Sequence, residues 1–384
     1  MIDWGLAEGT ALKLLPNGPA ATQQDAEEIV ASLYAAARTA EDHIGAVTRM
    51  QPIAPLAKVL VVDRQRWATA NIEGFRVAIT PLMESMREHR RQREADEVGQ
   101  VGQVGQPAGP TTSVASEDAT SRANTGSAVV NAIGSRATAF QVGTLLAFVG
   151  TKVLGQHELF TAPGVEPRLL LVAPNMLVAE RNLGVDPHAF RLWVCLHEET
   201  HRVQLASVPW LREHIKGDLK AFLDAADMDP TRVRERLGSV VSSVGASVRG
   251  ETGRSLLDAV QTPEQRAILD RLVALMTLLE GHADWAMDEV GDDVVPGVAQ
   301  VREKFEQRRD GVGALDQVLR RLFGLDQKLA QYRDGAVFVR AVVKQVGVDG
   351  LNAVWTSADT LPMRSEILEP HLWVQRVHGT GPTA

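Results

Sequence analysis

Five consecutive residues have the types and spacing of a metal-dependent hydrolytic site: His197-Glu198-Glu199-Thr200-His201 forms an HExxH motif. On a helix, positions four apart stack on one face, so His197 and His201 can each turn a ring nitrogen toward one point about 2 Å away, a zinc–ligand distance. Glu198 lies about 100° round the helix axis from His197. It is therefore beside the metal position, where a base can take a proton from water activated by the metal.

A well-marked helix is predicted to carry this motif over residues 186–208. Asp186 is suited to cap its N-terminus, and Pro187 fits the first turn, where the N–H that proline lacks would have no helical partner. Apolar side chains follow at helical spacing on the face that carries both histidines: Phe190, Trp193, Val194 and Leu205. The histidines are therefore expected to point into the protein. Two histidines that merely pack in a helical core are the alternative, and a third ligand decides, since catalytic zinc usually has three protein ligands.

A second helix is predicted to supply that third ligand. Residues 262–265 read Thr-Pro-Glu-Gln, a capping box with proline in the first turn, and the helix that they open can run to Val290. Two acids, Glu280 and Asp284, lie on its apolar stripe, and burying a carboxylate is costly unless a cation or strong donors accompany it. We therefore expect Glu280 to be the third zinc ligand. Asp284, one turn later, is expected to accept the outer N–H of a ligand histidine and fix its tautomer.

Other interpretations of these residues stay open. His282 competes with Glu280 as a ligand, but it lies about 200° away around the helix and is expected to face away. The two acids could instead form structural ion pairs with arginines such as Arg202 or Arg271. Cys195 lies two residues before the HExxH motif, on a different face of the helix, so we interpret it as a packed thiol.

The composition limits the partners and the compartment. The 384 residues carry a formal charge of −8 and a pI near 5.7, which argues against a general nucleic-acid binder, because many phosphates need a basic face. The one cysteine excludes an intramolecular disulfide and fits a reducing compartment. The N-terminus lacks the features of a signal peptide. Residues 128–155 are apolar but too short and too polar for a membrane span, so a buried helix is expected there. We predict a cytoplasmic protein that binds neither nucleic acid nor a membrane.

Three regions are predicted along the chain. Residues 1–97 form an N-terminal helical region, with helical patterns that begin at Thr22 and near Asp63. Residues 98–127 contain a repeated Val-Gly-Gln followed by many Gly, Pro, Ser and Thr residues. This composition cannot bury enough apolar area to offset chain ordering, so we expect a flexible insertion. Residues 128–384 form the catalytic region with C-terminal helices.

One short strand is predicted before the motif helix, because residues 167–174 are a brief apolar run framed by prolines. Such a strand could be an edge that aligns an extended substrate by backbone hydrogen bonds, or a buried core strand without ligand contact. After the motif, Pro209 and Trp210 are expected to break the helix.

Besides the HExxH motif, several blocks of the sequence, which together span most of the chain, resemble a known family. With these blocks the sequence resembles the bacterial zincin-like metallopeptidases, some of whose members are linked to biosynthesis of a deazaflavin coenzyme. The resembling stretches are residues 63–75, 152–160, 190–211, 278–288, 324–339 and 361–377. The arrangement is similar to that of gluzincins, which implies His197, His201 and Glu280 on zinc, Glu198 as general base and Asp284 behind a histidine.

The block at 324–339 adds candidates for stabilising charge during the reaction. Tyr332 could donate a hydrogen bond to a developing oxyanion, and Arg333 could hold a substrate carboxylate. An ordinary packed tyrosine is the alternative for Tyr332. His214 and His282 are further oxyanion candidates.

These observations predict a mainly α-helical, zincin-like fold with a small β element before the active-site helix. The predicted function is a zinc-dependent metallohydrolase, a peptidase in our interpretation, in which Glu198 takes a proton from zinc-activated water and passes it to the leaving amine of an amide bond. The expected cofactor is Zn²⁺ and the expected partner is a peptide or protein substrate; no oligomeric state is predicted. The alternatives are a metal-dependent amidase of a small metabolite, a non-catalytic helical scaffold stabilised by zinc, and a metal-free protein with a coincidental motif.

Overall fold

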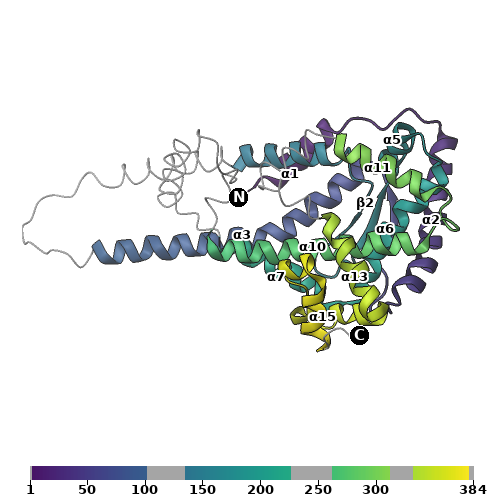
Figure 1. The fold of residues 1–384 in the computed structure, drawn as a ribbon. Helices are drawn as coiled ribbons and strands as arrows, with labels where there is room; N and C mark the ends of the chain where they lie inside the picture. Colours follow the sequence, from purple (N-terminus) through teal and green to yellow (C-terminus); the bar gives the residue numbers. More distant parts are fainter. Residues whose placement is uncertain (1, 102–134, 226–261, 312–331, 380–384) are drawn as a thin grey trace, which may run out of the picture. The chain divides into compact units, whose positions relative to one another are not determined.

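The described parts of the chain form long helices and one small three-stranded sheet (Figure 1). The structure is a computed structural model. It describes residues 2–101, 135–225, 262–311 and 332–379. The predicted mainly α-helical fold with a small β element is confirmed.

The described residues group into two compact units that interleave along the sequence. Unit 1 contains residues 1–20, 62–154 and 158–167, and unit 2 contains residues 21–61, 155–157 and 168–384. This grouping by contacts differs from the linear division at 97 and 128 that composition suggests. The predicted flexible insertion lies outside the described residues beyond Val101, and its first residues continue a helix.

The described residues of unit 1 include the helices α1 (Trp4–Leu14) and α3 (Arg64–Val101) and a helix over residues 135–149. α1 packs against α3, where Trp67 is only 1% exposed. Residues 135–149 lie in the stretch where a buried helix is expected. This helix buries Ala139 and Leu146 but leaves Phe140 56% exposed, so one of its faces is covered and another is not.

Three long helices carry unit 2: α2 (Gln23–Thr48), α6 (Pro187–Ser207) and α10 (Pro263–Val290). Each begins where the sequence predicts. α2 and α10 both open with a capping box, formed by Thr22 and Thr262 respectively. The carboxylate of Asp186 caps α6 by accepting the backbone N–H of Ala189 at 2.8 Å. Local sequence signals therefore fix the starts of the two helices that carry the HExxH motif and Glu280.

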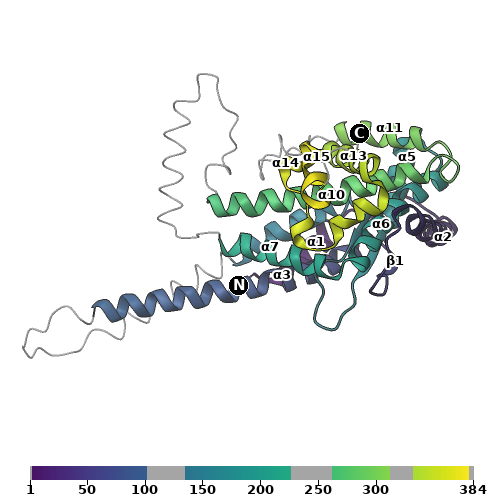
Figure 2. The ribbon, with the colours of Figure 1, turned by 60° about the horizontal axis from the view of Figure 1, so that its bottom comes forward.

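The helices of unit 2 pack around α6 and α10. α6 contacts α2 and α10, and α10 also contacts α13 (Tyr332–Leu351), as Figure 2 shows. Leu33 of α2, Phe190 and Leu196 of α6, and Leu278 of α10 are completely buried. The motif helix α6 is therefore packed against both α2 and α10.

A buried guanidinium links α6 to its neighbours. Arg202 is 7% exposed, and its Nη1 lies 2.7 Å from the Glu199 carboxylate and 3.0 Å from the Glu41 carboxylate of α2. Its Nε donates to the Ala57 carbonyl at 2.7 Å. Because a buried charge needs such partners, Arg202 ties α6 to α2 and to the segment that leads into the sheet.

The sheet has three short strands in the order β1 (Lys58–Val62), β3 (Arg168–Val172) and β2 (Gly155–His157). β2 runs antiparallel to β3, with Gly155 opposite Leu171. β3 is the strand that the sequence predicts. It is paired on both sides and Leu169 to Val172 are buried, so of the two alternatives it is the core strand rather than a substrate-aligning edge. The two edges of the described sheet are β1 and β2, and β2 contacts α6.

The remaining described elements surround these helices: α5 (Ala173–Leu183), α7 (Pro209–Asp224), α11 (Val298–Gly311), η2 (Asn352–Trp355), η3 (Ala358–Thr360), α14 (Arg364–Leu368) and α15 (Pro370–His378). α6 ends at Ser207 and α7 begins at Pro209, so the predicted helix break is confirmed. Among the described helices, none combines the length and apolarity needed to cross a membrane.

α10 and α13 cross with their backbones in contact. A Cβ atom on Gly281 would lie 2.1 Å from the backbone carbon of Gly335, and one on Gly335 would lie 2.1 Å from the carbonyl oxygen of Thr277. Only glycine at both positions permits this approach. Gly281 directly follows Glu280, so the crossing also sets the position of the predicted third ligand.

We predict opposite effects for the same substitution at two helical glycines. Gly281→Ala should lower the free energy of unfolding by about 1–3 kcal/mol, because the added methyl group forces α10 and α13 apart. Gly45→Ala in α2, where a Cβ atom meets nothing within 4 Å, should raise it by about 0.5–1 kcal/mol through helix propensity. Urea unfolding of the two variants and the parent measures both changes. Equal effects at the two positions would contradict the close crossing.

Candidate metal centre

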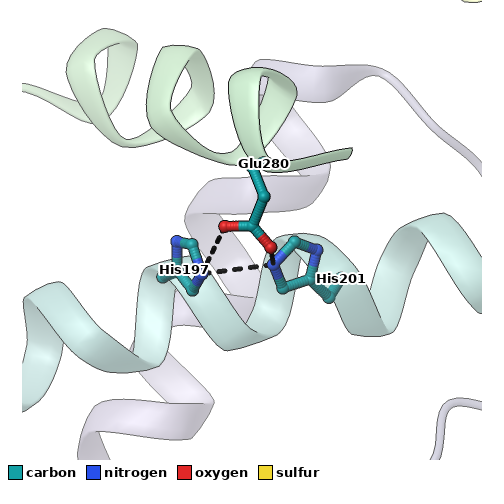
Figure 3. Close-up of side chains that lie close together, drawn as sticks. All are labelled: His197, His201 and Glu280. Atoms are coloured by element: carbon teal, nitrogen blue, oxygen red, sulfur yellow. Dashed lines mark hydrogen bonds and ion pairs between the residues drawn. The ribbon is translucent and has the colours of Figure 1, made fainter. Parts of the chain in front are cut away.

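The two motif histidines and Glu280 meet at one point between α6 and α10 (Figure 3). The Nε2 atoms of His197 and His201 are 3.2 Å apart. The Glu280 carboxylate lies over both rings, with one oxygen 3.6 Å from Nε2 of His197 and the other 3.4 Å from Nε2 of His201. Among the described residues, these three form the group of His, Cys, Asp or Glu side chains that could hold a metal ion.

The spacing of these atoms suits a tetrahedral zinc ion. Ligands about 2.0–2.1 Å from tetrahedral zinc are about 3.3 Å from one another, which follows from the geometry of the tetrahedron. The three separations here, 3.2, 3.4 and 3.6 Å, bracket that value. The side chains of His197, His201 and Glu280 are also 27%, 17% and 33% exposed, so the cluster is open on one side. Two imidazoles, one carboxylate and an open side are the ligand set of a catalytic rather than a structural zinc site.

The electrostatics of the cluster favour a cation. Burial acts to lower the pKa of His201, but hydrogen bonding and charge from Glu280, together with Glu198 and Gln204, outweigh it and raise the pKa to about 9. Two carboxylates thus stabilise positive charge at Nε2 of His201. A divalent ion bound at the same place would be stabilised in the same way.

Glu198 is held beside the cluster by the edge strand. It is only 9% exposed, and a Cβ atom on Gly155 of β2 would lie 2.4 Å from its carboxylate carbon. Burial raises the pKa of Glu198 to about 7, with the nearby charge of Glu280 adding to the rise and His201 opposing it. A carboxylate with a pKa near neutrality is well matched to proton transfer.

Gln204, which belongs to no motif of the sequence, contacts the cluster from one turn further along α6. Its Oε1 lies 3.0 Å from Nδ1 of His201, the ring nitrogen that faces away from Glu280. Its Nε2 lies 2.9 Å from Nδ1 of His282. The available signal was spacing, because residues three apart on a helix are neighbours.

His282 lies behind the cluster and is not part of it, in agreement with its predicted position. It is fully buried, and its ring centroid is 5.5 Å from those of Trp285 and Trp355. Burial lowers its pKa to about 3, so the ring is neutral. The direct zinc-ligand alternative for His282 therefore has no support in the geometry.

The arginines considered as ion-pair partners for the two acids pair elsewhere. Arg202 contacts Glu199 and Glu41, as described above, and Arg271 lies 2.7 Å from Asp218. Asp284 is half-buried on α10, and its backbone carbonyl accepts a hydrogen bond from Arg302 at 3.4 Å. A hydrogen bond from a ligand histidine to the Asp284 side chain stays a prediction.

The remaining candidates have different outcomes. Tyr332 begins α13, three residues before the crossing at Gly335, but its side chain and that of Arg333 lie outside the described residues. Their proposed roles stay predictions. His214 of α7 lies 3.7 Å from Asp218 and packs edge-on against Trp210. 

Cys195 is a packed thiol, as interpreted from the sequence. It is 2% exposed, its sulfur is 3.9 Å from the Leu33 carbonyl oxygen, and burial raises its pKa well above the usual range. A thiol in this state is a poor metal ligand and a poor nucleophile.

Comparison with known proteins identifies the family. A model of zincin-like metallopeptidases matches residues 2–374. The chain belongs to the zincin-like metallopeptidase family. The solved structures include a similar chain from Chloroflexus aurantiacus, described as a proposed hydrolase with a novel fold. It has a TM-score of 0.66 and 27% identity, and the match covers 99% of the present chain and 100% of the other. No curated protein matches this zincin-like protein. Family and neighbour together support a metallohydrolase with a divalent metal.

We predict that the zincin-like protein binds one equivalent of zinc. Glu280→Gln should raise the zinc dissociation constant by more than about 100-fold, because the loss of a ligand should weaken binding more than the loss of a hydrogen bond to a ligand does. Zinc at 100 times its dissociation constant should stabilise the parent by about 2.7 kcal/mol. Titration calorimetry and thermal unfolding measure these effects. Asp288→Asn, on the same helix and paired with Arg302 at 2.6 Å, is the control and should bind zinc like the parent. Equal zinc affinity in the Glu280→Gln variant would remove Glu280 from the site.

A second prediction concerns the contact between β2 and Glu198. Gly155→Ala should lower the free energy of unfolding by about 1–3 kcal/mol, although alanine normally suits a strand better than glycine, because the methyl group overlaps the Glu198 side chain. Adding Glu198→Ala removes the overlap and should restore most of the loss. Gln156→Ala, on the opposite face of the strand, is the control. A Gly155→Ala protein as stable as the parent would contradict the contact.

Proposed function

We propose that this chain is a zinc-dependent peptidase in which Glu198 is the general base. The observation that carries the proposal is the convergence of Nε2 of His197, Nε2 of His201 and the Glu280 carboxylate at separations that fit tetrahedral zinc, with the Glu198 carboxylate beside them. His197, His201 and Glu280 would hold the ion. Zinc, when bound, would polarise a carbonyl group and lower the pKa of water.

One side chain of the protein, that of Glu198, performs both proton transfers. Glu198 accepts a proton from the attacking water through its carboxylate and returns it to the nitrogen of the leaving amine. Its raised pKa lets the same group act as base and then as acid near neutral pH. Gly155 limits the space behind the carboxylate and so holds it on the side of the cluster.

A peptide substrate is supported by the strand beside the base. β2 is one of the two edge strands of the described sheet and contacts α6, and its Gly155 touches Glu198. An extended peptide can add to such an edge through backbone hydrogen bonds, which would bring its carbonyl groups past the base. A small-metabolite amide would need no such edge, so a peptide is the substrate class we favour.

The test is to incubate a proteome-derived peptide library with zinc-loaded parent and with zinc-loaded Glu198→Gln protein. The parent should cleave a defined set of peptides, and the variant should cleave them about 10²–10⁴ times more slowly with an unchanged zinc content, because it keeps the ligands and loses the base. Mass spectrometry of new termini provides the measurement.

Two other results would reject the proposal. If neither fully loaded protein cleaves any peptide, a zinc-stabilised scaffold or an amidase of small metabolites replaces the peptidase. If the variant cleaves as fast as the parent, Glu198 is not the base.

A further inference from the structure

Gln204 makes a polar bridge between the two helices of the metal centre. It is completely buried on α6. Its side-chain oxygen faces Nδ1 of His201 at 3.0 Å, and its side-chain nitrogen faces Nδ1 of His282 at 2.9 Å and the backbone carbonyl of Leu279 at 3.2 Å. All three polar neighbours are therefore within hydrogen-bond distance of one amide group.

The Leu279 carbonyl fixes which way this amide points. A carbonyl oxygen only accepts, so the NH₂ group of Gln204 must face it. The opposite orientation would put two oxygens 3.2 Å apart in a buried position, where a lost hydrogen bond is costly. The oxygen of Gln204 must then face His201. It can only accept, so Nδ1 of His201 must carry a proton.

The same orientation fixes His282. The second N–H of the Gln204 amide points to Nδ1 of His282, which must therefore be the unprotonated nitrogen. The ring proton then lies on Nε2, a buried atom that has no hydrogen-bond partner among the described residues and belongs to a ring packed against Trp285 and Trp355. A neutral His282 with one fixed tautomer is thus an acceptor that helps to hold Gln204 in place.

We propose that Gln204 is a positioning residue that keeps the Nδ1–H tautomer of His201 and so directs the lone pair of Nε2 toward the metal, with Leu279 and His282 orienting the amide. The proposal rests on the zinc site proposed above. Leu279 immediately precedes Glu280. The amide of Gln204 therefore contacts both a ligand on α6, His201, and the segment of α10 that carries the third ligand.

The test compares zinc affinity in full-length variants by competition with a chromophoric chelator. Gln204→Met keeps the volume and removes both hydrogen-bonding groups, and it should raise the zinc dissociation constant about 10–100-fold. His282→Phe keeps the aromatic packing and removes one acceptor, so it should raise the constant by less. The double variant should resemble Gln204→Met alone, because both changes act through the same amide.

The control and a second measurement separate positioning from a general loss of structure. Thr200→Val removes a completely buried hydroxyl that bonds only to the Leu196 carbonyl of its own helix at 2.9 Å, and it should leave zinc affinity unchanged. The visible spectrum of the cobalt-substituted protein should change in the Gln204→Met variant and not in the Thr200→Val variant, since the orientation of a ligand ring has changed only in the first.

Three results would overturn the inference. The first is a Gln204→Met protein that folds without metal and binds zinc as tightly as the parent. The second is a double variant in which the effects of Gln204→Met and His282→Phe on the dissociation constant multiply. The third is a folded His282→Phe single variant with the zinc affinity of the parent, which would remove His282 from the proposal. A parent that binds no zinc would reject the metal centre itself, which distinguishes failure of the proposed function from failure of this inference.

Discussion

The concentration of negative charge at the junction of α6 and α10 is the constraint on which the rest of the site depends. Glu198 is almost fully buried, and Glu280 lies against two imidazoles a few ångströms away. Carboxylates in such surroundings need a compensating cation. The pKa of His201 is raised for the same reason, because these carboxylates stabilise its protonated ring. The packing of the two helices must therefore hold these groups together against their mutual repulsion.

Several contacts supply that restraint from outside the site. The paired glycines Gly281 and Gly335 let α13 press directly on the turn of α10 that carries Glu280. Arg202 anchors the motif helix to α2 through Glu41 and, through Ala57, to the segment just before β1. Each contact joins segments that are far apart in the sequence, so the geometry of the ligands is a property of the whole unit rather than of the motif helix alone.

The parts of the fold that follow from local rules could be predicted from the sequence. Capping residues mark the starts of α2, α6 and α10, and helical periodicity brings the two histidines onto one face. The convergence of Glu280 on them could be expected because an acid on an apolar stripe needs a cation. The fold class follows from the same patterns.

Long-range pairing could not be predicted in the same way. β2 has three residues, too few for an alternating pattern. The need for glycine at position 155 arises only from its contact with the Glu198 side chain, which the sequence does not reveal. Gln204 resembles any polar residue on a helix until Leu279 and His282 are seen around its amide. The interleaving of the two units along the sequence could not be predicted either, since contacts such as those between α2 and α6 leave no trace in composition.

The burial of Cys195 gives the molecule an internal reporter. The chain has a single thiol, and it lies in the motif helix, two residues before the first histidine, pressed against the backbone of α2. Alkylating reagents reach such a sulfur only when the helix separates from its neighbour. The rate at which the intact protein is labelled therefore measures how often the motif helix separates from α2, without any mutation.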